Sequence, residues 1–247
     1  MNEFANVYRG RRVLVTGHTG FKGSWLVTWL NHLGAEVAGF SDRVPTTPAM
    51  FTALDLGGRT HHHLGDIRDR ERLAEVFDEF RPEFVFHLAA QALVLESYND
   101  PVRTFETNAM GMVNLLECLR ERPWVEVAVL VTSDKTYRNN EWEWGYRETD
   151  VIGGLDPYSG SKSCAELMAH SYHHSFLRQA PTNSATARAG NVIGGGDWAA
   201  NRIVPDCIRA WSAGETLTVR RPQATRPWQH VLEPLSGYLW LGACLSH

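Results

Sequence analysis

Cysteine and long apolar runs are scarce in this sequence. The 247 residues include four cysteines, Cys118, Cys164, Cys207 and Cys244, which lie far apart and form no C-x-x-C pair. This spacing favours reduced, mostly buried thiols over disulfides or a zinc site. No apolar run reaches the roughly 20 residues of a membrane-spanning helix, and no charged-then-apolar leader opens the chain. We therefore expect a cytoplasmic protein without a membrane partner.

Acidic residues outnumber basic residues only slightly. The formal net charge is -4 at pH 7, which creates no field that would collect nucleic acid or an anionic membrane. An anionic ligand must therefore be bound by a local cluster of side chains, and we expect no nucleic-acid partner. The length is enough for one large α/β domain, with or without a small appendage.

Short aliphatic runs alternate with longer amphipathic stretches from Arg12 onward. The expected strands are residues 13–16, 36–40, the segment around His63, 84–87, 127–132 and 185–188. The expected helices, in which apolar residues recur at helical spacing, are residues 23–33, 70–80, 101–120 and 158–178. This order is typical of strands laid parallel by helical crossovers. It predicts an α/β fold with a Rossmann-like doubly wound parallel sheet.

The composition changes after Gly190. Glycine, tryptophan, arginine and proline become frequent, and only short strand or helix signals remain. This change predicts a Rossmann domain over residues 1–190 and a small substrate-binding portion over residues 191–247. A last helix is expected at residues 234–245. It stops at His247 without a capping glycine or a polar tail, so we expect the native polypeptide to continue and the substrate-binding portion to be incomplete.

The strongest local signal follows the first expected strand. Glycines recur there with the spacing G-x-x-G-x-x-G at Gly17, Gly20 and Gly23, and Phe21 and Lys22 lie between the last two. Glycine lets the backbone turn tightly and lets a pyrophosphate approach main-chain N–H groups at the helix N-terminus. Because a strand precedes this loop and a helix follows it, the segment predicts a dinucleotide-binding site.

An acidic residue follows the glycines at the distance that such a site requires. Asp42 ends the second strand, where its carboxylate could accept hydrogen bonds from an adenosine ribose and would repel a 2′-phosphate, which favours NAD over NADP. Arg43 beside it could instead pair with a 2′-phosphate, so NADP stays open as the alternative. Asp66 and Ile67, after the third strand, could grip an adenine, or Asp66 could cap the helix that begins near Asp69.

A second group of polar residues predicts acid–base chemistry. Tyr158 and Lys162 are four residues apart and therefore share one helix face. A nearby ammonium favours the phenolate and could bring the pKa of a tyrosine from about 10 towards 7. Ser133, Asp134 and Lys135 add a hydroxyl, a carboxyl and an amine at a strand C-terminus, where open α/β sheets place their chemistry. A polar turn with an Asp–Lys surface pair is the structural alternative.

Together these motifs resemble the extended short-chain dehydrogenases/reductases that modify nucleotide sugars. The resemblance rests on the three glycines, on His-Leu-Ala-Ala-Gln at residues 87–91, and on Ser133, Tyr158 and Lys162. Within this family, Asp134 followed by Lys135 is similar to the CDP-glucose 4,6-dehydratases, whereas the dTDP-glucose and GDP-mannose 4,6-dehydratases carry Asp-Glu. The strings at residues 188–198 and 224–234 are similar to the same CDP-glucose enzymes.

The resemblance implies an NAD-dependent dehydration of CDP-glucose to its 4-keto-6-deoxy form by internal hydride transfer from C4 to C6. Tyr158 would take the proton of the 4-hydroxyl, Ser133 would bond that oxygen, and Lys162 would anchor the nicotinamide ribose. Asp134 would protonate the leaving 6-hydroxyl. Lys135 stands where relatives have a glutamate, so it would remove the C5 proton as a neutral amine or leave that step to another group.

Further ligand contacts are expected around these residues. Cofactor contacts beyond the glycine loop fall on Leu88, Ala89, Ala90 and Asn108, and substrate contacts on Gln91, Asn191, Arg202 and Arg226. Guanidinium forks bind phosphate oxygens in pairs, and an amide can donate beside them. By analogy with the family, helices 101–120 and 158–178 would form a homodimer contact, alone or within a dimer of dimers.

Two other functions stay open from the sequence. One is a 4,6-dehydratase or 4-epimerase that acts on a dTDP-, GDP- or UDP-linked sugar. The other is a nucleotide-sugar-binding protein that has lost turnover, against which the intact acid–base residues argue. No metal is expected, because the three histidines at residues 61–63 would alternate between the two faces of a strand.

Overall fold

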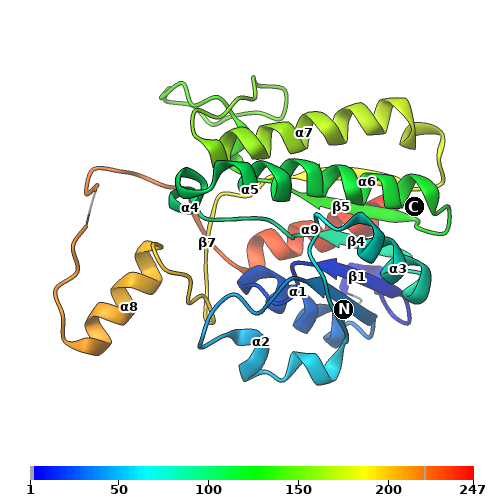
Figure 1. Cartoon of the computed structure of the whole chain (residues 1–247), viewed down its shortest axis with the longest axis horizontal. Coiled ribbons are helices and arrows are strands. Elements are labelled where there is room, and N and C mark those ends of the chain that lie inside the picture. The colour runs from blue at the N-terminus through cyan, green and yellow to red at the C-terminus, as the bar shows by residue number, and fades with distance from the viewer. Residues whose placement is uncertain (1–2, 220) are drawn as a thin grey trace.

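A six-stranded parallel sheet forms the centre of the protein (Figure 1). The computed structural model describes residues 3–219 and 221–247. The strand order is β3-β2-β1-β4-β5-β6, and every neighbouring pair runs parallel. The strands are β1 (Arg12–Thr16), β2 (Glu36–Ser41), β3 (His61–Leu64), β4 (Phe84–His87), β5 (Val127–Val131) and β6 (Asn183–Ala187). The predicted Rossmann-like fold is confirmed, with the expected strands at the expected places.

Helices cover both faces of this sheet. The long helices are α1 (Phe21–His32), α3 (Arg70–Phe80), α6 (Gly111–Glu121), α7 (Pro157–Ser175) and α9 (Leu232–Leu245). Side chains of β1 alternate between two cores: Leu14 packs with α3, α6 and α7, whereas Val13 and Val15 pack with α1 and α9. This alternation follows from the two-residue period of a strand. The central strands β1, β4 and β5 are therefore apolar at most positions, whereas the edge strands β3 and β6 are more polar and less buried.

The helix expected at residues 101–120 is interrupted by a π turn. It consists of α5 (Pro101–Phe105), the π-helical segment η3 (Glu106–Met110) and α6. Asp100 caps α5 by accepting a hydrogen bond from the backbone N–H of Arg103. One wide turn inside a helix rotates the side chains that follow it, and such turns are frequent at functional sites. Here the π turn contains Asn108, which is buried.

Residues 191–247 divide into a peripheral part and a helix that returns to the core. Strands β7 (Asn191–Ile193) and β8 (Trp228–His230) pair with each other, and between them lies α8 (Ile203–Ala213), a helix that the sequence did not predict. Figure 1 shows α8 standing away from the sheet. Helix α9, by contrast, buries Leu235 and Leu239 in the same core as β1. The substrate-binding role of residues 191–247 therefore concerns mainly β7, α8 and β8, and it stays a prediction.

Shorter segments complete the chain. They are α2 (Met50–Ala53), α4 (Val94–Asn99) and the turns η1 (Glu3–Asn6), η2 (Leu56–Arg59), η4 (Asp134–Thr136) and η5 (Leu177–Gln179). All four cysteines are free thiols; the expectation that most are buried is wrong, because only Cys118 is buried and Cys244 is exposed. Along the described residues, no helix is both long and apolar enough to cross a bilayer.

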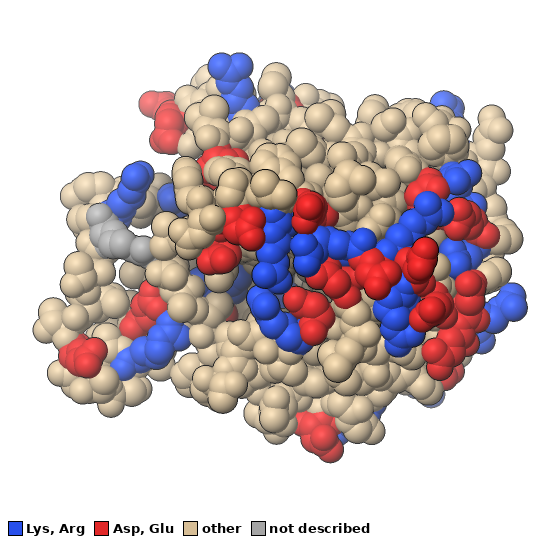
Figure 2. All heavy atoms as spheres, in the orientation of Figure 1, with Lys and Arg blue, Asp and Glu red and all other residues tan. Residues whose placement is uncertain are grey.

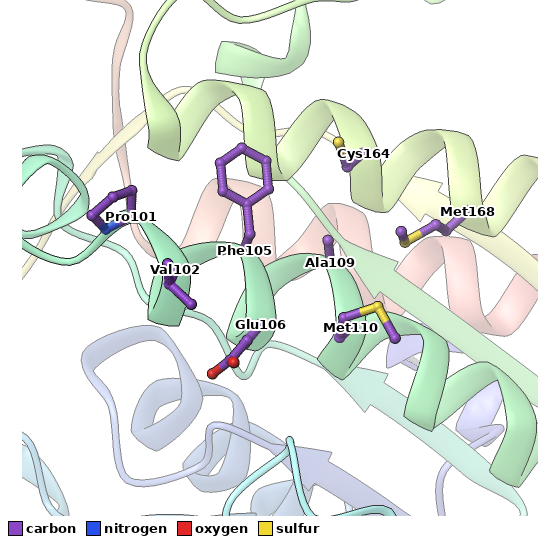
Figure 3. Close-up of a pocket in the computed structure, with 8 residues that line it drawn as sticks. All are labelled: Pro101, Val102, Phe105, Glu106, Ala109, Met110, Cys164 and Met168. Atoms are coloured by element: carbon purple, nitrogen blue, oxygen red, sulfur yellow. The ribbon is translucent and has the colours of Figure 1, made fainter.

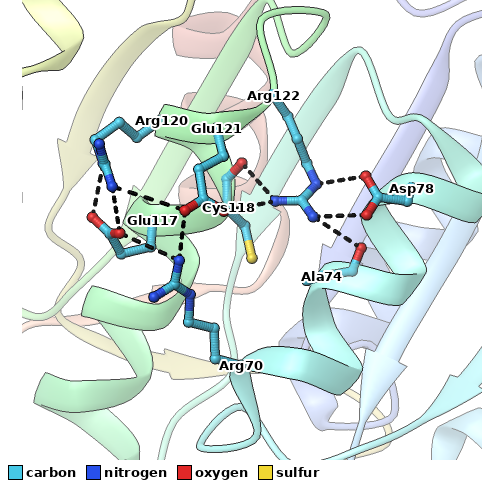
Figure 4. A network of polar contacts seen from close by, with 8 residues as sticks. All are labelled: Arg70, Ala74, Asp78, Glu117, Cys118, Arg120, Glu121 and Arg122. Carbon is cyan, nitrogen blue, oxygen red and sulfur yellow. Dashed lines mark hydrogen bonds and ion pairs between the residues drawn. The ribbon is translucent and has the colours of Figure 1, made fainter.

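Ion pairs join α3 to α6 on the surface. Arg122 forms two parallel hydrogen bonds with Asp78, at 2.9 and 2.8 Å (Figure 4). Arg70 reaches Glu121 at 2.6 Å and Glu117 at 3.4 Å. Figure 2 shows acidic and basic side chains interleaved over this face rather than separated into patches of one sign.

Candidate active site

The glycine loop joins β1 to the N-terminus of α1. Gly17 has φ +75°, and a Cβ there would lie 2.7 Å from the backbone nitrogen of Ala89. A Cβ on Gly23 would lie 2.1 Å from the carbonyl oxygen of Gly17. Both positions therefore exclude any larger residue, and the backbone without side chains lets a ligand come close to the N-terminus of α1. This cradle fits the pyrophosphate of a dinucleotide.

Beneath the loop lies a buried histidine whose role the sequence did not reveal. The Nε2 of His18 lies 2.7 Å from the Nδ1 of His62, and its Nδ1 lies 2.9 Å from the hydroxyl of Ser41. Burial lowers the pKa of His18 to about 3, and neighbouring His62 adds to this shift. A Cβ on Gly39 would collide with the His18 ring at 2.1 Å. His62 itself is exposed, and its Nδ1 is engaged by His18. The described residues contain no cluster of three metal-binding side chains.

The acidic residues after β2 and β3 lie at the same edge of the sheet. Asp42 is partly exposed, and the guanidinium groups of Arg43 and Arg103 each approach its carboxylate to 3.9 Å. Asp66 binds the Arg68 side chain at 2.8 Å. The alternative that Asp66 caps α3 is wrong, because the cap is Asp69. Asp66 therefore stays available for the predicted contact with an adenosine.

The segment after β4 passes directly over the glycine loop and is held by the π turn. Leu88 and Ala89 provide the backbone atoms nearest to Gly17. The Asn108 amide accepts from the N–H of Gln91 at 2.8 Å and donates to its carbonyl at 3.0 Å and to Ser161 at 2.9 Å. Asn108 thus ties this segment to α7.

The side chain of Gln91 is turned back onto its own loop. Its amide nitrogen donates to the carbonyl of Leu93 and to the hydroxyl of Thr104, each at 3.0 Å. Its amide oxygen accepts from the N–H of Leu93 at 2.6 Å. The predicted contact of Gln91 with substrate would require these bonds to be exchanged, and it stays a prediction.

Tyr158, Ser133 and Asp134 converge at the carboxyl ends of β5 and β6. The Ser133 hydroxyl lies close enough to the Tyr158 phenol to lower its pKa, and it donates to the Asp134 carboxylate at 3.1 Å. Tyr158 reaches this place because Asp156 caps α7 and the backbone N–H of Tyr158 donates to Ser97 at 3.1 Å. One hydroxyl therefore bridges the predicted base and the predicted acid.

Burial controls the protonation of the Tyr–Lys pair. It lowers the pKa of Lys162 to about 7; the charge of Lys22 lowers it further, and Glu166 opposes the shift. Burial raises the pKa of Tyr158, although the bond from Ser133 opposes this. The expected fall of the Tyr158 pKa towards 7 is therefore wrong: burial of the phenol, together with the Asp134 and Asp156 carboxylates, raises the pKa more than Ser133 and Arg202 lower it.

Lys135 lies between two oxygen atoms of the site. Its Nζ is 3.2 Å from the Asp134 carboxylate and 3.2 Å from the side-chain oxygen of Asn191. The segment Asp134–Thr136 and strand β7 are thereby brought together although 56 positions separate Lys135 from Asn191. Both side chains are partly exposed, at about 30%, so the alternative of an Asp–Lys pair in a polar turn stays open.

The two predicted substrate arginines differ in their surroundings. Arg202 pairs with Asp197 at 2.9 Å and lies close enough to Lys22 to lower its pKa. Arg226 is exposed and donates to the carbonyl of Thr225. Burial also lowers the pKa of Lys22 to about 8, the largest influence on that group.

Tyr238 of α9 was not predicted as part of the site. Its hydroxyl lies 3.5 Å from the Nζ of Lys22, it is buried, and its pKa is raised by burial and then by Tyr158. Its place in an apolar C-terminal helix gave no signal of this contact.

A doubly wound sheet, a glycine loop at its first crossover and a buried Tyr-x-x-x-Lys helix define a dinucleotide-binding short-chain dehydrogenase/reductase. Residues 14–241 match the family model described as GDP-mannose 4,6 dehydratase, and the chain belongs to this family. It is 51% identical over 239 residues to the CDP-glucose 4,6-dehydratase of Salmonella typhimurium. The matched region covers 95% of this chain and 67% of that protein.

More distant relatives share the same fold. The CDP-paratose 2-epimerase of Salmonella typhi is 28% identical over 76% of this chain and 59% of its own length. A dTDP-glucose 4,6-dehydratase of Streptomyces venezuelae, solved with NAD bound, superposes with a TM-score of 0.84 at 25% identity, over 94% of this chain and 72% of that one. The chain thus spans 59% to 67% of these two curated relatives. The predicted family is confirmed, and the 51% identity favours dehydration of CDP-glucose over the other predicted activities.

Proposed function

We propose that this protein removes water from CDP-glucose to give its 4-keto-6-deoxy form. NAD would serve as a cofactor that is regenerated in each turnover. The observation that carries the proposal is the convergence of Tyr158, Ser133 and Asp134, joined through one hydroxyl. A phenol beside a carboxyl provides a base for oxidation at C4 and an acid for loss of water from C6. The 51% identity to a CDP-glucose 4,6-dehydratase supports the same substrate.

The cofactor would be held by the loop from β1 to α1 and by the ends of β2 and β4. The cradle at Gly17 and Gly23 fits its pyrophosphate, and Asp42 is placed for the adenosine ribose. Lys162 would bind the nicotinamide ribose. When bound, NAD supplies a reversible acceptor for the hydride of the sugar. We propose NAD rather than NADP because the solved dehydratase relative contains NAD and a carboxylate at Asp42 repels a 2′-phosphate.

The chain's own residues would move the protons. Tyr158 takes the proton of the 4-hydroxyl, with Ser133 bonding the same oxygen. The resulting ketone acidifies C5, and Asp134 protonates the 6-hydroxyl as it leaves as water. Arg202 and the exposed Arg226 would bind the diphosphate.

Lys135 would remove the C5 proton, or it would leave that step to another group. Replacing Lys135 with alanine should lower kcat by about 100-fold or more, because a positioned base contributes roughly that much. Deuterium incorporation at C5 in heavy water should fall with it, as measured by mass spectrometry of the product. Normal turnover with normal incorporation at C5 would show that another group does this work. Lys22→Ala is not a suitable control because Lys22 lies in the same site. Arg70→Ala is suitable, because Arg70 pairs with Glu117 and Glu121 on the α3–α6 surface.

The test of the function as a whole is direct incubation with nucleotide sugars. CDP-, dTDP-, GDP- and UDP-glucose should each be supplied with NAD, and products separated by mass spectrometry. Loss of one water from CDP-glucose alone supports the proposal. An unchanged mass with an inverted C4 centre would identify a 4-epimerase. Stabilisation by NAD and CDP-glucose in a thermal-shift assay without any product would identify a binding protein.

We propose that the outer faces of α5, η3 and α7 form the contact between two copies of this chain. A groove lies between these helices, and Figure 3 shows the side chains that line it. Its volume is about 450 Å³. Its lining residues are Pro101, Val102, Phe105, Glu106, Ala109, Met110, Cys164 and Met168. Only one of them is charged, so the groove fits an apolar partner. A second copy presents the same paired helices, and a two-fold axis would make such a face self-complementary.

A charge placed in this groove should separate the copies. Met110→Glu should give a monomer by sedimentation velocity, because the new carboxylate would be buried without a partner. Ile208→Glu on α8 is the matched control, since Ile208 is 43% exposed and Met110 is 49% exposed. Equal masses for the wild type and both variants would contradict the proposed interface.

A further inference from the structure

One buried ion pair next to the site has no part in the chemistry described above. Glu166 lies on α7, one turn beyond Lys162 and two turns beyond Tyr158, so all three share a helix face. Its carboxylate is 5% exposed. Arg188, just after β6, binds both of its oxygens, at 2.9 and 3.1 Å. The hydroxyl of Thr132, the residue before Ser133, donates to the same carboxylate.

The other side of Arg188 faces a loop. Its guanidinium carbon lies 4.7 Å from the centre of the Tyr137 ring, and it donates to the carbonyl of Glu148 at 3.2 Å. Burial raises the pKa of Glu166, but the bonds from Arg188 and Thr132 outweigh burial and lower it. Both Glu166 and Arg188 are therefore charged.

The loop that Arg188 contacts is an ordered aromatic hairpin, residues 137–152. Its ends pair at Tyr137 and Ile152, and the Arg138 N–H donates to the carbonyl of Val151 at 2.9 Å. Inside it, the rings of Tyr137 and Tyr146 stack at 5.1 Å. Trp142 packs on Tyr146 at 5.0 Å. Figure 1 shows this segment as the green loop above the start of α7.

The aromatic hairpin connects the two catalytic segments. It begins directly after Asp134–Thr136. Four residues then separate its end from the start of α7 at Pro157. Any shift of the hairpin is therefore transmitted to the acid on one side and to Tyr158 on the other. The contacts just described tie the hairpin base to the middle of α7 through one guanidinium.

We propose that Glu166 and Arg188 form a positioning pair, which anchors the aromatic hairpin to α7 and so sets the separation of the two catalytic segments. A buried ion pair adds little net stability, because the cost of removing both charges from water offsets their attraction. Its fixed bidentate geometry, however, specifies one arrangement of the parts that it joins. The kinetic part of this inference rests on the proposed dehydratase function, and the structural part does not.

The test compares Arg188→Gln and Glu166→Gln with a matched control. Arg122→Gln removes another buried arginine, which also binds a carboxylate through two bonds and lies 5.8 Å from an aromatic ring, but between α3 and α6 (Figure 4). Without substrate, the backbone amides of residues 138–152 should exchange hydrogen about tenfold faster than in the wild type in Arg188→Gln and Glu166→Gln, but not in Arg122→Gln. With CDP-glucose their kcat should fall about 10- to 100-fold, as small misplacements of reacting groups do, while NAD affinity is unchanged.

Two outcomes would overturn the proposal. The first is a rate of hydrogen exchange in residues 138–152 of Arg188→Gln that equals the wild-type rate. An equal increase of that rate in Arg122→Gln would have the same meaning. The second concerns Arg188→Lys, which serves if the glutamine variant does not fold. A lysine keeps the charge but cannot bind two oxygens and stack on Tyr137 at once, so wild-type exchange and kcat in that variant would refute positioning. If the wild type does not turn over CDP-glucose, the exchange result still decides this inference while the proposed function fails.

Discussion

Replacing Tyr158 with phenylalanine should lower kcat about 10²- to 10⁴-fold, the range that positioned acid–base groups contribute. The phenol is the group proposed to accept the proton of the 4-hydroxyl, and phenylalanine has no atom that can do so. The fold should persist, because the ring stays buried and only the hydroxyl is lost. Product formation from CDP-glucose, measured by mass spectrometry, checks this.

The same variant should change the dependence of the rate on pH. Burial raises the pKa of Tyr158, so the deprotonated phenol that accepts a proton becomes more abundant as pH rises, and the wild-type rate should rise with it. The residual rate of Tyr158→Phe should lose this dependence. Tyr172→Phe is the control, since Tyr172 lies on the same helix but contacts Glu117. A Tyr158→Phe rate within a few-fold of wild type would remove the phenol from the mechanism.

Replacing Asp134 with asparagine should also lower dehydration about 10²- to 10⁴-fold, but at a different step. An amide can still bond Ser133 and Lys135, yet it cannot protonate the leaving 6-hydroxyl. Oxidation at C4 and removal of the C5 proton should continue. CDP-glucose recovered from heavy water should therefore gain deuterium at C5 although little water is lost from the sugar.

This separation of steps makes the assignment of Asp134 testable apart from that of Tyr158. The Tyr158 variant should show neither exchange at C5 nor dehydration, whereas the Asp134 variant should show exchange alone. Asp78→Asn is the control, because Asp78 pairs with Arg122 far from the site. Dehydration at the wild-type rate in Asp134→Asn would mean that another group supplies the proton.

The sheet and its order were predictable because each element carries its own local pattern. The strands β1, β4 and β5 are apolar at most positions, as strands buried on both faces must be. Helix α8 was missed although most of its residues are apolar, because it contains a proline and its surroundings are rich in glycine and tryptophan. The π turn was missed as well, because a helix that contains one wide turn has almost the same apolar spacing as a regular helix.

The local sequence alone determined that a dinucleotide loop follows β1 and that Tyr158 and Lys162 share one face of a helix, since both features depend on residues within a few positions of each other. Only the tertiary structure decided which distant groups meet: Lys135 with Asn191, Glu166 with Arg188, and His18 with His62. It also decided the protonation of Lys162, whose pKa of about 7 comes first from burial. Burial and long-range contact depend on how whole helices and strands pack, and no short stretch of sequence contains that information.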